Sequence, residues 1–304
     1  MWRAIDISGD GYYICVRNNN LCVLKGDEEK LHVNFLDINC IVLHGNSITY
    51  TNSAIQKCLE NEIPVVFCDK THTPAGMLLP HFNISEYGKR LEIQLSVSQP
   101  VQKQAWRQIV TEKLTNQAAC LASFKENDSK HLHMLSGFAK EVKSGDITFR
   151  EGIGAKIYFE GLFDDFHRND KNEDIVNSSL NYGYSILRSS MARAVVSCGL
   201  NPAISVFHSK NQNPFCLVDD LMEPLRPMVD YIVKLRFADF IKEKTLTPVL
   251  KKLLVSMTEK KLLFEDSEYS FIFGLHRYVQ SYLMYISKQC EKITFPKPFY
   301  DIKI

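Results

Sequence analysis

Up to about residue 80, short apolar runs follow the period of two that half-buried strands show. Residues 12–16 and 21–24 are two such runs, and they flank Asn18, Asn19 and Asn20. Asparagine tolerates left-handed backbone, so this triplet predicts a hairpin turn. Further β-rich runs occupy residues 31–35, 41–43 and 65–68, with a short helix predicted at 51–61. We therefore expect a small β domain over residues 1–80.

From about residue 95 onward, the apolar positions recur at helical spacing instead. Asp146 and Asp174 are good N-terminal caps for two of the predicted helices, and Gly199 with Pro202 would end the second. Further helices are predicted at residues 229–240, 248–257 and 269–289. The fold class is therefore predicted to be α+β, with a linker at 81–95, an all-α catalytic domain at 96–290 and a tail at 291–304.

The composition is that of a water-soluble chain with a substantial core. The 304 residues are 45% hydrophobic, yet no apolar run reaches the ~18 residues of a membrane helix. The N-terminus lacks the long apolar stretch of a signal peptide. The nine cysteines stand singly, without a C-x-x-C pair, as expected for reduced thiols. We expect a cytoplasmic prokaryotic protein with no membrane partner.

The net charge of +1 argues against a broadly basic nucleic-acid-binding surface. Any DNA contact must therefore rest on local clusters of cations. Two clusters are candidates, and each is either a phosphate-binding patch or a solvated helix face. They are Lys103, Arg107 and Lys113, and then Lys242, Lys244, Lys251, Lys252, Lys260 and Lys261.

The stretch from His208 to Asp230 is the most informative part of the chain. Pro224 and Pro227 lie directly beside Glu223 and Arg226. Proline is poor inside a helix, because it lacks an N–H and its ring clashes with the preceding turn. We expect this segment to fix charged side chains in place.

Glu151 and His208 each allow two interpretations from the residues alone. Glu151 lies near a helix start on the face of Tyr158 and Leu162, where a buried carboxylate needs a cation or hydrogen bonds. It either supports the helix N-terminus or binds a metal. His208 follows the apolar run 203–207, and it is either a capping residue or a ligand.

Together these motifs resemble the CRISPR-associated integrase family, the catalytic subunit that inserts new spacer DNA into a CRISPR array. Residues 150–159 read Arg-Glu-Gly-Ile-Gly-Ala-Lys-Ile-Tyr-Phe, and residues 220–227 read Asp-Leu-Met-Glu-Pro-Leu-Arg-Pro. Residues 181–184 are similar to the family's Asn-Tyr-Gly-Tyr helix. The stretches 41–49 and 63–69 are similar to its β domain. The sequence of residues 158–163 looks most like that of family members from type II CRISPR systems.

The resemblance implies a site for Mg²⁺ or Mn²⁺ with Glu151, His208 and Glu223 as ligands and catalytic residues. Mixed oxygen and nitrogen donors suit these ions. Asp220, Arg226, Asn181 and Tyr182 are expected to support the site. Lys156, Arg188 and His167 are expected to contact DNA. Tyr182 and Tyr184 either stack on bases or belong to the core.

The resemblance also implies an activity and partners. The activity is integration of short double-stranded DNA by 3′-OH transesterification. The implied partners are DNA, a second copy bound through the β domain, and a small CRISPR-associated subunit that completes a heterohexamer. Two alternatives stay open: a metal-dependent endonuclease or resolvase acting on branched DNA, and a non-catalytic DNA-binding scaffold. No P-loop motif is present, so ATP hydrolysis is not predicted.

Overall fold

The computed structural model describes residues 3–61, 63, 65–69, 74–78, 84–124, 130–163, 166, 168, 174–208, 213–243, 246–298 and 300. The chain forms two compact units. Unit 1 comprises Met1–Leu95 and Ala192–Asn201, and unit 2 comprises Ser96–Met191 and Pro202–Ile304. Among the described residues, no helix is long and apolar enough to cross a membrane.

Unit 1 contains a four-stranded sheet in the order β4-β3-β2-β6. Its strands are β2 (Tyr12–Arg17), β3 (Asn20–Lys25), β4 (Glu28–Asn34) and β6 (Ile48–Tyr50). The β2–β3 turn is formed by Asn18 and Asn19, with φ angles of 47° and 57°. Both therefore adopt the left-handed backbone that a two-residue hairpin loop requires. The predicted hairpin is confirmed.

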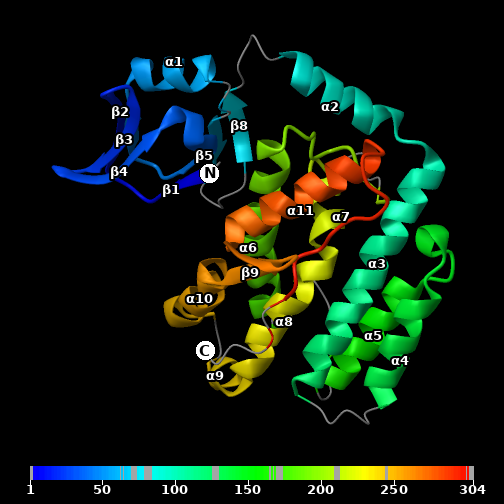
Figure 1. Ribbon diagram of the computed structural model, residues 1–304. Helices are drawn as coiled ribbons and strands as arrows, with labels where there is room; N and C mark the ends of the chain where they lie inside the picture. Colours follow the sequence, from blue (N-terminus) through cyan, green and yellow to red (C-terminus); the bar gives the residue numbers. More distant parts are fainter. Residues whose placement is uncertain are drawn as a thin grey trace. The chain divides into compact units, whose positions relative to one another are not determined.

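A second four-stranded sheet in unit 1 has the order β1-β5-β7-β8, with β8 antiparallel to β7 and the other pairs parallel. Its strands are β1 (Arg3–Ser8), β5 (Ile38–His44), β7 (Val65–Cys68) and β8 (Pro74–Leu78). A 3₁₀ turn, η1 (Phe35–Asp37), precedes β5, and α1 (Asn52–Glu60) precedes β7. Apolar residues from both sheets and α1 form one core. The strands and the helix that contribute to it are drawn in shades of blue in Figure 1.

The helix α2 (Ile84–Ser96) occupies most of the span expected as a linker. Arg90 of α2 donates a hydrogen bond to the Cys198 carbonyl at 3.1 Å. The Gln94 side chain donates a hydrogen bond to the Asn201 carbonyl and accepts one from the Asn201 N–H. These bonds explain why α2 and residues 192–201 belong to the same unit.

Unit 2 is mostly helical, as predicted. Its helices are α3 (Gln99–Ala122), α4 (Lys130–Glu141), α5 (Arg150–Leu162), α6 (Ile175–Ser197), α7 (Cys216–Met222), α8 (Arg226–Leu235), α9 (Phe237–Lys242), α10 (Pro248–Val255) and α11 (Phe271–Ile286). The last six residues of α6, 192–197, belong to unit 1. Short 3₁₀ turns are η3 (Ser144–Asp146), η4 (Glu223–Leu225) and η5 (Ser256–Glu259). The helices α3, α4 and α5 lie side by side (Figure 1).

Two short strands interrupt the region that the sequence predicted as all helical. They are β9 (Lys261–Phe264) and β10 (Ser267–Ser270), which pair antiparallel. Glu265 in the turn between them has a φ of 55°, and this left-handed backbone lets the chain reverse its direction. Leu262 and Phe264 are buried on alternate positions of β9, so a period of two is present, but over only four residues.

Candidate functional site

The first turn of α5 places Glu151. The Asp146 carboxylate accepts hydrogen bonds from the backbone N–H groups of Arg150 and Glu151 at 2.9 and 3.0 Å. Asp146 thus caps the helix as predicted, although it lies four residues before the helix begins. Gly154 packs so closely on Leu114 of α3 that a Cβ at this position would lie 2.2 Å from the leucine side chain. Glycine therefore lets α5 approach α3, which brings Glu151 toward the α3 surface.

Glu223 lies in the 3₁₀ turn between α7 and α8. The Asn116 side chain of α3 donates a hydrogen bond to the Pro224 carbonyl at 2.8 Å, which fixes this turn to α3. The prolines lie where helical N–H groups would lack partners, at the start of η4 and of α8. The Glu223 side chain is 11% exposed, and its Oε1 accepts from Arg226 Nε at 2.8 Å.

Lys113 of α3 joins the two acids. Its Nζ lies 2.5 Å from Glu151 Oε1 and 2.5 Å from Glu223 Oε2. Burial opposes the charge of this lysine, but Glu223 and Glu151 outweigh it and raise the pKa of Lys113. Burial likewise opposes ionisation of Glu223, but Arg226 and Lys113 outweigh it and lower the Glu223 pKa to about 2. Both groups are therefore charged at neutral pH.

His208 is held by the fully buried Asp220. One Asp220 oxygen lies 2.7 Å from His208 Nδ1, and the other accepts the N–H groups of Val206 and Phe207 at 2.8 and 2.7 Å. The hydrogen bond to Asp220 raises the pKa of His208, against burial. Trp106 packs its ring edge-to-face with the imidazole at 4.8 Å. With Nδ1 bonded to a carboxylate, Nε2 is the nitrogen suited to bind a metal.

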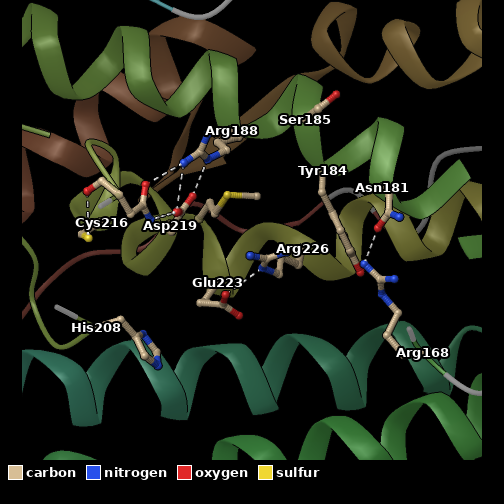
Figure 2. Close-up of a pocket in the computed structure, with 12 residues that line it drawn as sticks. Arg168, Asn181, Tyr184, Ser185, Arg188, His208, Cys216, Asp219, Glu223 and Arg226 are labelled. Atoms are coloured by element: carbon tan, nitrogen blue, oxygen red, sulfur yellow. Dashed lines mark hydrogen bonds and ion pairs between the residues drawn. The ribbon is translucent and has the colours of Figure 1, made fainter. Parts of the chain in front are cut away.

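His208 and Glu223 line a cavity of about 470 Å³ together with three arginines. Figure 2 shows Glu223 and Arg226 at its centre and His208 to one side. Arg188 is paired with Asp219 at 2.6 and 3.1 Å. Arg168 donates to Asn181 at 2.6 Å. The cavity thus combines carboxylates and an imidazole with guanidinium groups, which bind phosphate well.

Not all of the other predicted site residues lie at the cavity. Asn181 lines the cavity, whereas the Tyr182 ring lies beneath Lys251 Nζ at 5.6 Å and is not part of the lining. Lys156 is 78% exposed, pairs with Glu160 and also lies outside the lining. His167 lies outside the described residues.

Tyr184 lines the cavity but is otherwise a core residue. Its side chain is buried, and its hydroxyl donates to Asp230 at 2.5 Å. Arg226 and Arg168 lie over its ring at 4.8 and 5.4 Å. The tyrosine therefore holds two guanidinium groups at the cavity wall.

The donors fit a divalent cation at the position between the two acids. The point that Lys113 Nζ occupies is 2.5 Å from an oxygen of each carboxylate, close to the distances at which oxygen ligands hold divalent metals. Glu151, His208 and Glu223 nevertheless form a looser group than a closed coordination shell. Among the described residues, the group of potential ligands whose atoms all lie within 4.8 Å of one another is a different one, in unit 1.

That compact group consists of Cys22, Glu29 and His32 on β3 and β4. Its members satisfy one another: Glu29 accepts from the Cys22 thiol at 3.2 Å and lies 3.1 Å from His32 Nδ1. Burial, with the hydrogen bond to Glu29, raises the pKa of Cys22 to about 11. The thiol is therefore protonated at neutral pH, and the group forms a hydrogen-bonded cluster on the hairpin.

Lys113 is the residue that sequence reasoning missed. The sequence predicts a phosphate-binding or solvated cluster of Lys103, Arg107 and Lys113, and the solvated interpretation is wrong for Lys113 because its side chain is buried. A signal was present: Lys113 follows Trp106, Ile109 and Val110 at helical spacing, and all three are buried. A lysine on the apolar face of a helix needs a buried anion as partner.

Comparison with known proteins assigns the chain to a family. The sequence profile described as "CRISPR associated protein Cas1" matches residues 5–266. The chain belongs to the Cas1 family. A relative from Neisseria meningitidis serogroup C (strain 8013), named "CRISPR-associated endonuclease Cas1", is 32% identical over 300 residues, covering 97% of this chain and 96% of the relative. The family resemblance stated from the sequence motifs is confirmed.

Solved structures share the fold across the whole chain. A chain of a "Partial Cas6-RT-Cas1--Cas2 complex" matches with a TM-score of 0.79 and 19% identity, covering 100% of both chains. A "Casposase bound to integration product" matches with a TM-score of 0.75 and 21% identity, covering 99% of this chain and 100% of the other. Both likenesses show that this chain shares its fold with these proteins.

Proposed function

We propose that this protein is a divalent-metal-dependent integrase that inserts short double-stranded DNA into a CRISPR array. The observation that carries the proposal is that Glu151 and Glu223 share the Lys113 ammonium group, while Glu223 and His208 line one arginine-lined cavity. Two carboxylates and an imidazole from three separate elements would hold Mg²⁺ or Mn²⁺ there. When bound, this ion would lower the pKa of an attacking hydroxyl and neutralise charge on the transferring phosphate.

The protein's own groups position the reactants. Asp220 fixes the imidazole so that Nε2 faces away from it, and Arg226 holds Glu223 ionised. Arg168 and Arg188 line the cavity where a DNA phosphate would enter. The Tyr184 ring packs against the guanidinium groups of Arg168 and Arg226. The attacking group is a 3′-hydroxyl of the incoming fragment, so the reaction is a transesterification that requires no protein nucleophile.

Relatives support the proposed partners. The casposase that shares the fold is bound to an integration product, and another structural neighbour is part of a complex with Cas2. For this chain we propose DNA, a second copy of itself and a small Cas2-like subunit, arranged as a heterohexamer with two active sites. A homodimer formed through the β domain would show about twice the 34.9 kDa chain mass in light scattering at micromolar concentration. A monomer there would contradict this arrangement.

The activity is tested with a labelled short duplex, a supercoiled CRISPR plasmid, the small partner subunit and Mg²⁺ or Mn²⁺. Joined product that disappears with EDTA is the expected result. Cleavage without joining would favour the endonuclease named in the Neisseria relative's description. Binding without either reaction would leave only a DNA-binding scaffold. Each outcome is read on the same gel.

A further inference from the structure

The contact between Lys113 and both acids shows what a divalent ion must replace. The Lys113 side chain is 7% exposed, and its Nζ lies 2.5 Å from one oxygen of each carboxylate. The three side chains come from α3, α5 and η4, so the ammonium group connects three elements that lie far apart in the sequence. Because each buried charge needs a partner, this lysine stabilises the acids in the absence of any metal.

Each Glu223 oxygen already contacts a cation in this arrangement. Its Oε1 accepts from Arg226 at 2.8 Å, and its Oε2 accepts from Lys113. The oxygen that faces Glu151 is Oε2, since Lys113 bonds to both residues there. A divalent ion that bridges the same two oxygens, Glu151 Oε1 and Glu223 Oε2, would take the position of the ammonium nitrogen. Two cations cannot occupy that position together, because they would overlap and repel each other.

We infer that Lys113 is a built-in competitor of the divalent metal, which holds Glu151 and Glu223 together until the ion displaces its ammonium group. This inference rests on the proposed function, since it concerns the same site. Its consequence is a metal affinity lower than the two carboxylates alone would provide. A second consequence is that metal loading frees a cation on α3 beside the site.

The first test measures Mn²⁺ binding without DNA, by the electron paramagnetic resonance signal of free Mn²⁺. Lys113→Met is expected to bind Mn²⁺ more than about tenfold more tightly than the wild type, because a charge at the same position is removed. Lys113→Arg keeps the charge and should show no gain. Lys156→Met is the matched control, since that lysine is exposed on α5, and it should bind like the wild type.

A second measurement needs no variant and so covers the case in which Lys113→Met fails to fold. Lysines of the wild-type protein are labelled with acetic anhydride and quantified by mass spectrometry. Lys113 should label slowly without metal and at least several-fold faster with saturating Mn²⁺, whereas Lys156 should label equally in both. Glu223→Gln should abolish the metal-dependent change.

The outcomes separate the two proposals. If the wild type binds no Mn²⁺, or if Glu151→Gln binds Mn²⁺ as tightly as the wild type does, the proposed metal site is wrong. This inference is then wrong with it. If the wild type binds Mn²⁺ there, but Lys113→Met binds no more tightly and Lys113 labelling is unchanged by Mn²⁺, only the competition is wrong. A purely structural lysine would lower the melting temperature of Lys113→Met without altering Mn²⁺ affinity.

Discussion

Each unit of the molecule contains a partly buried cluster of charged side chains, and the two clusters differ in how their charges are matched. In unit 1, Asp6 of β1 accepts from His44 and from Arg193, whose Nη1 lies 2.7 Å away. Arg193 also lies 3.1 Å from His44 Nε2. The Asp6 carboxylate is thus contacted by two neighbours that also contact each other.

In unit 2 two carboxylates, Glu151 and Glu223, share one ammonium group, and Arg226 supplies a second cation to Glu223 alone. This cluster borders a cavity, and the nearby His208 side chain is 46% exposed. Acids that share a cation can exchange it for a more highly charged one. The comparison therefore predicts that the unit 1 cluster serves stability and the unit 2 cluster serves function.

The largest effect is expected from Glu151→Gln. Losing this carboxylate should lower DNA joining on the order of 10³-fold, because the charge that would hold the metal is removed. Stability should change little, since Lys113 keeps Glu223 as a partner. Joining rate and melting temperature are the measurements. Glu160→Gln on the same helix is the control, and it should join DNA like the wild type.

The unit 1 cluster should respond in the opposite way. Asp6→Asn removes the carboxylate that lies 2.7 Å from the buried Arg193, which should lower the free energy of unfolding by about 3 kcal/mol. The joining rate per folded molecule should stay near the wild-type value at low temperature. Asp239→Asn breaks the exposed pair with Arg236 and should lower stability by less than about 1 kcal/mol. An Asp6→Asn protein that is fully stable but inactive would reverse the comparison.

A smaller effect is expected where a carboxylate acts through His208. In Asp220→Asn the new amide N–H would face Nδ1, so the imidazole proton would move to Nε2 and block that nitrogen as a ligand. Joining should fall by about 10- to 100-fold. The pKa of His208, measured by NMR, should also fall, because the bond to Asp220 raises it. Asp219→Asn is the matched control, because Asp219 pairs with Arg188 and should leave the His208 pKa unchanged.

The comparison also separates what sequence could predict from what it could not. The β2–β3 hairpin and the start of α5 follow from local chemistry, namely two asparagines in left-handed backbone and one capping aspartate. The β9–β10 hairpin was missed, because four-residue strands give too few alternating positions to outweigh the helical pattern on both sides. Its turn also lacks the glycine that usually marks one.

The candidate ligands came from the family motifs, whereas their arrangement depends on contacts that no local pattern encodes. Lys113 meets Glu151 and Glu223 across 38 and 110 positions of sequence. Those contacts exist because Gly154 lets α5 approach α3 and because Asn116 binds the Pro224 carbonyl. The sequence indicated that Lys113 lies on an apolar helix face, but not which anion it would find there.

A further prediction concerns the pH dependence of stability set by a third acid, Asp230, seven positions after Glu223. Burial raises the pKa of Asp230 to about 7 from the ordinary 3.8, although hydrogen bonds from Tyr184 and Tyr158 oppose this rise. At Glu223, in contrast, the neighbouring cations lower the pKa to about 2. The folded state thus holds the Asp230 proton more tightly than the unfolded chain does. Stability from this group is fully present below about pH 4 and is lost as the pH rises through about 7.

Asp230→Asn keeps an oxygen that can accept from Tyr184 but cannot ionise. Its stability relative to the wild type should therefore increase with pH, by on the order of 1 kcal/mol per pH unit between about pH 5 and pH 7. Denaturant unfolding of both proteins at several pH values measures this difference. Tyr184→Phe removes the bond that lowers the pKa, so it should move the wild-type pH dependence upward. A difference that stays constant with pH would mean that Asp230 has a charge partner as effective as the Lys113 and Arg226 beside Glu223.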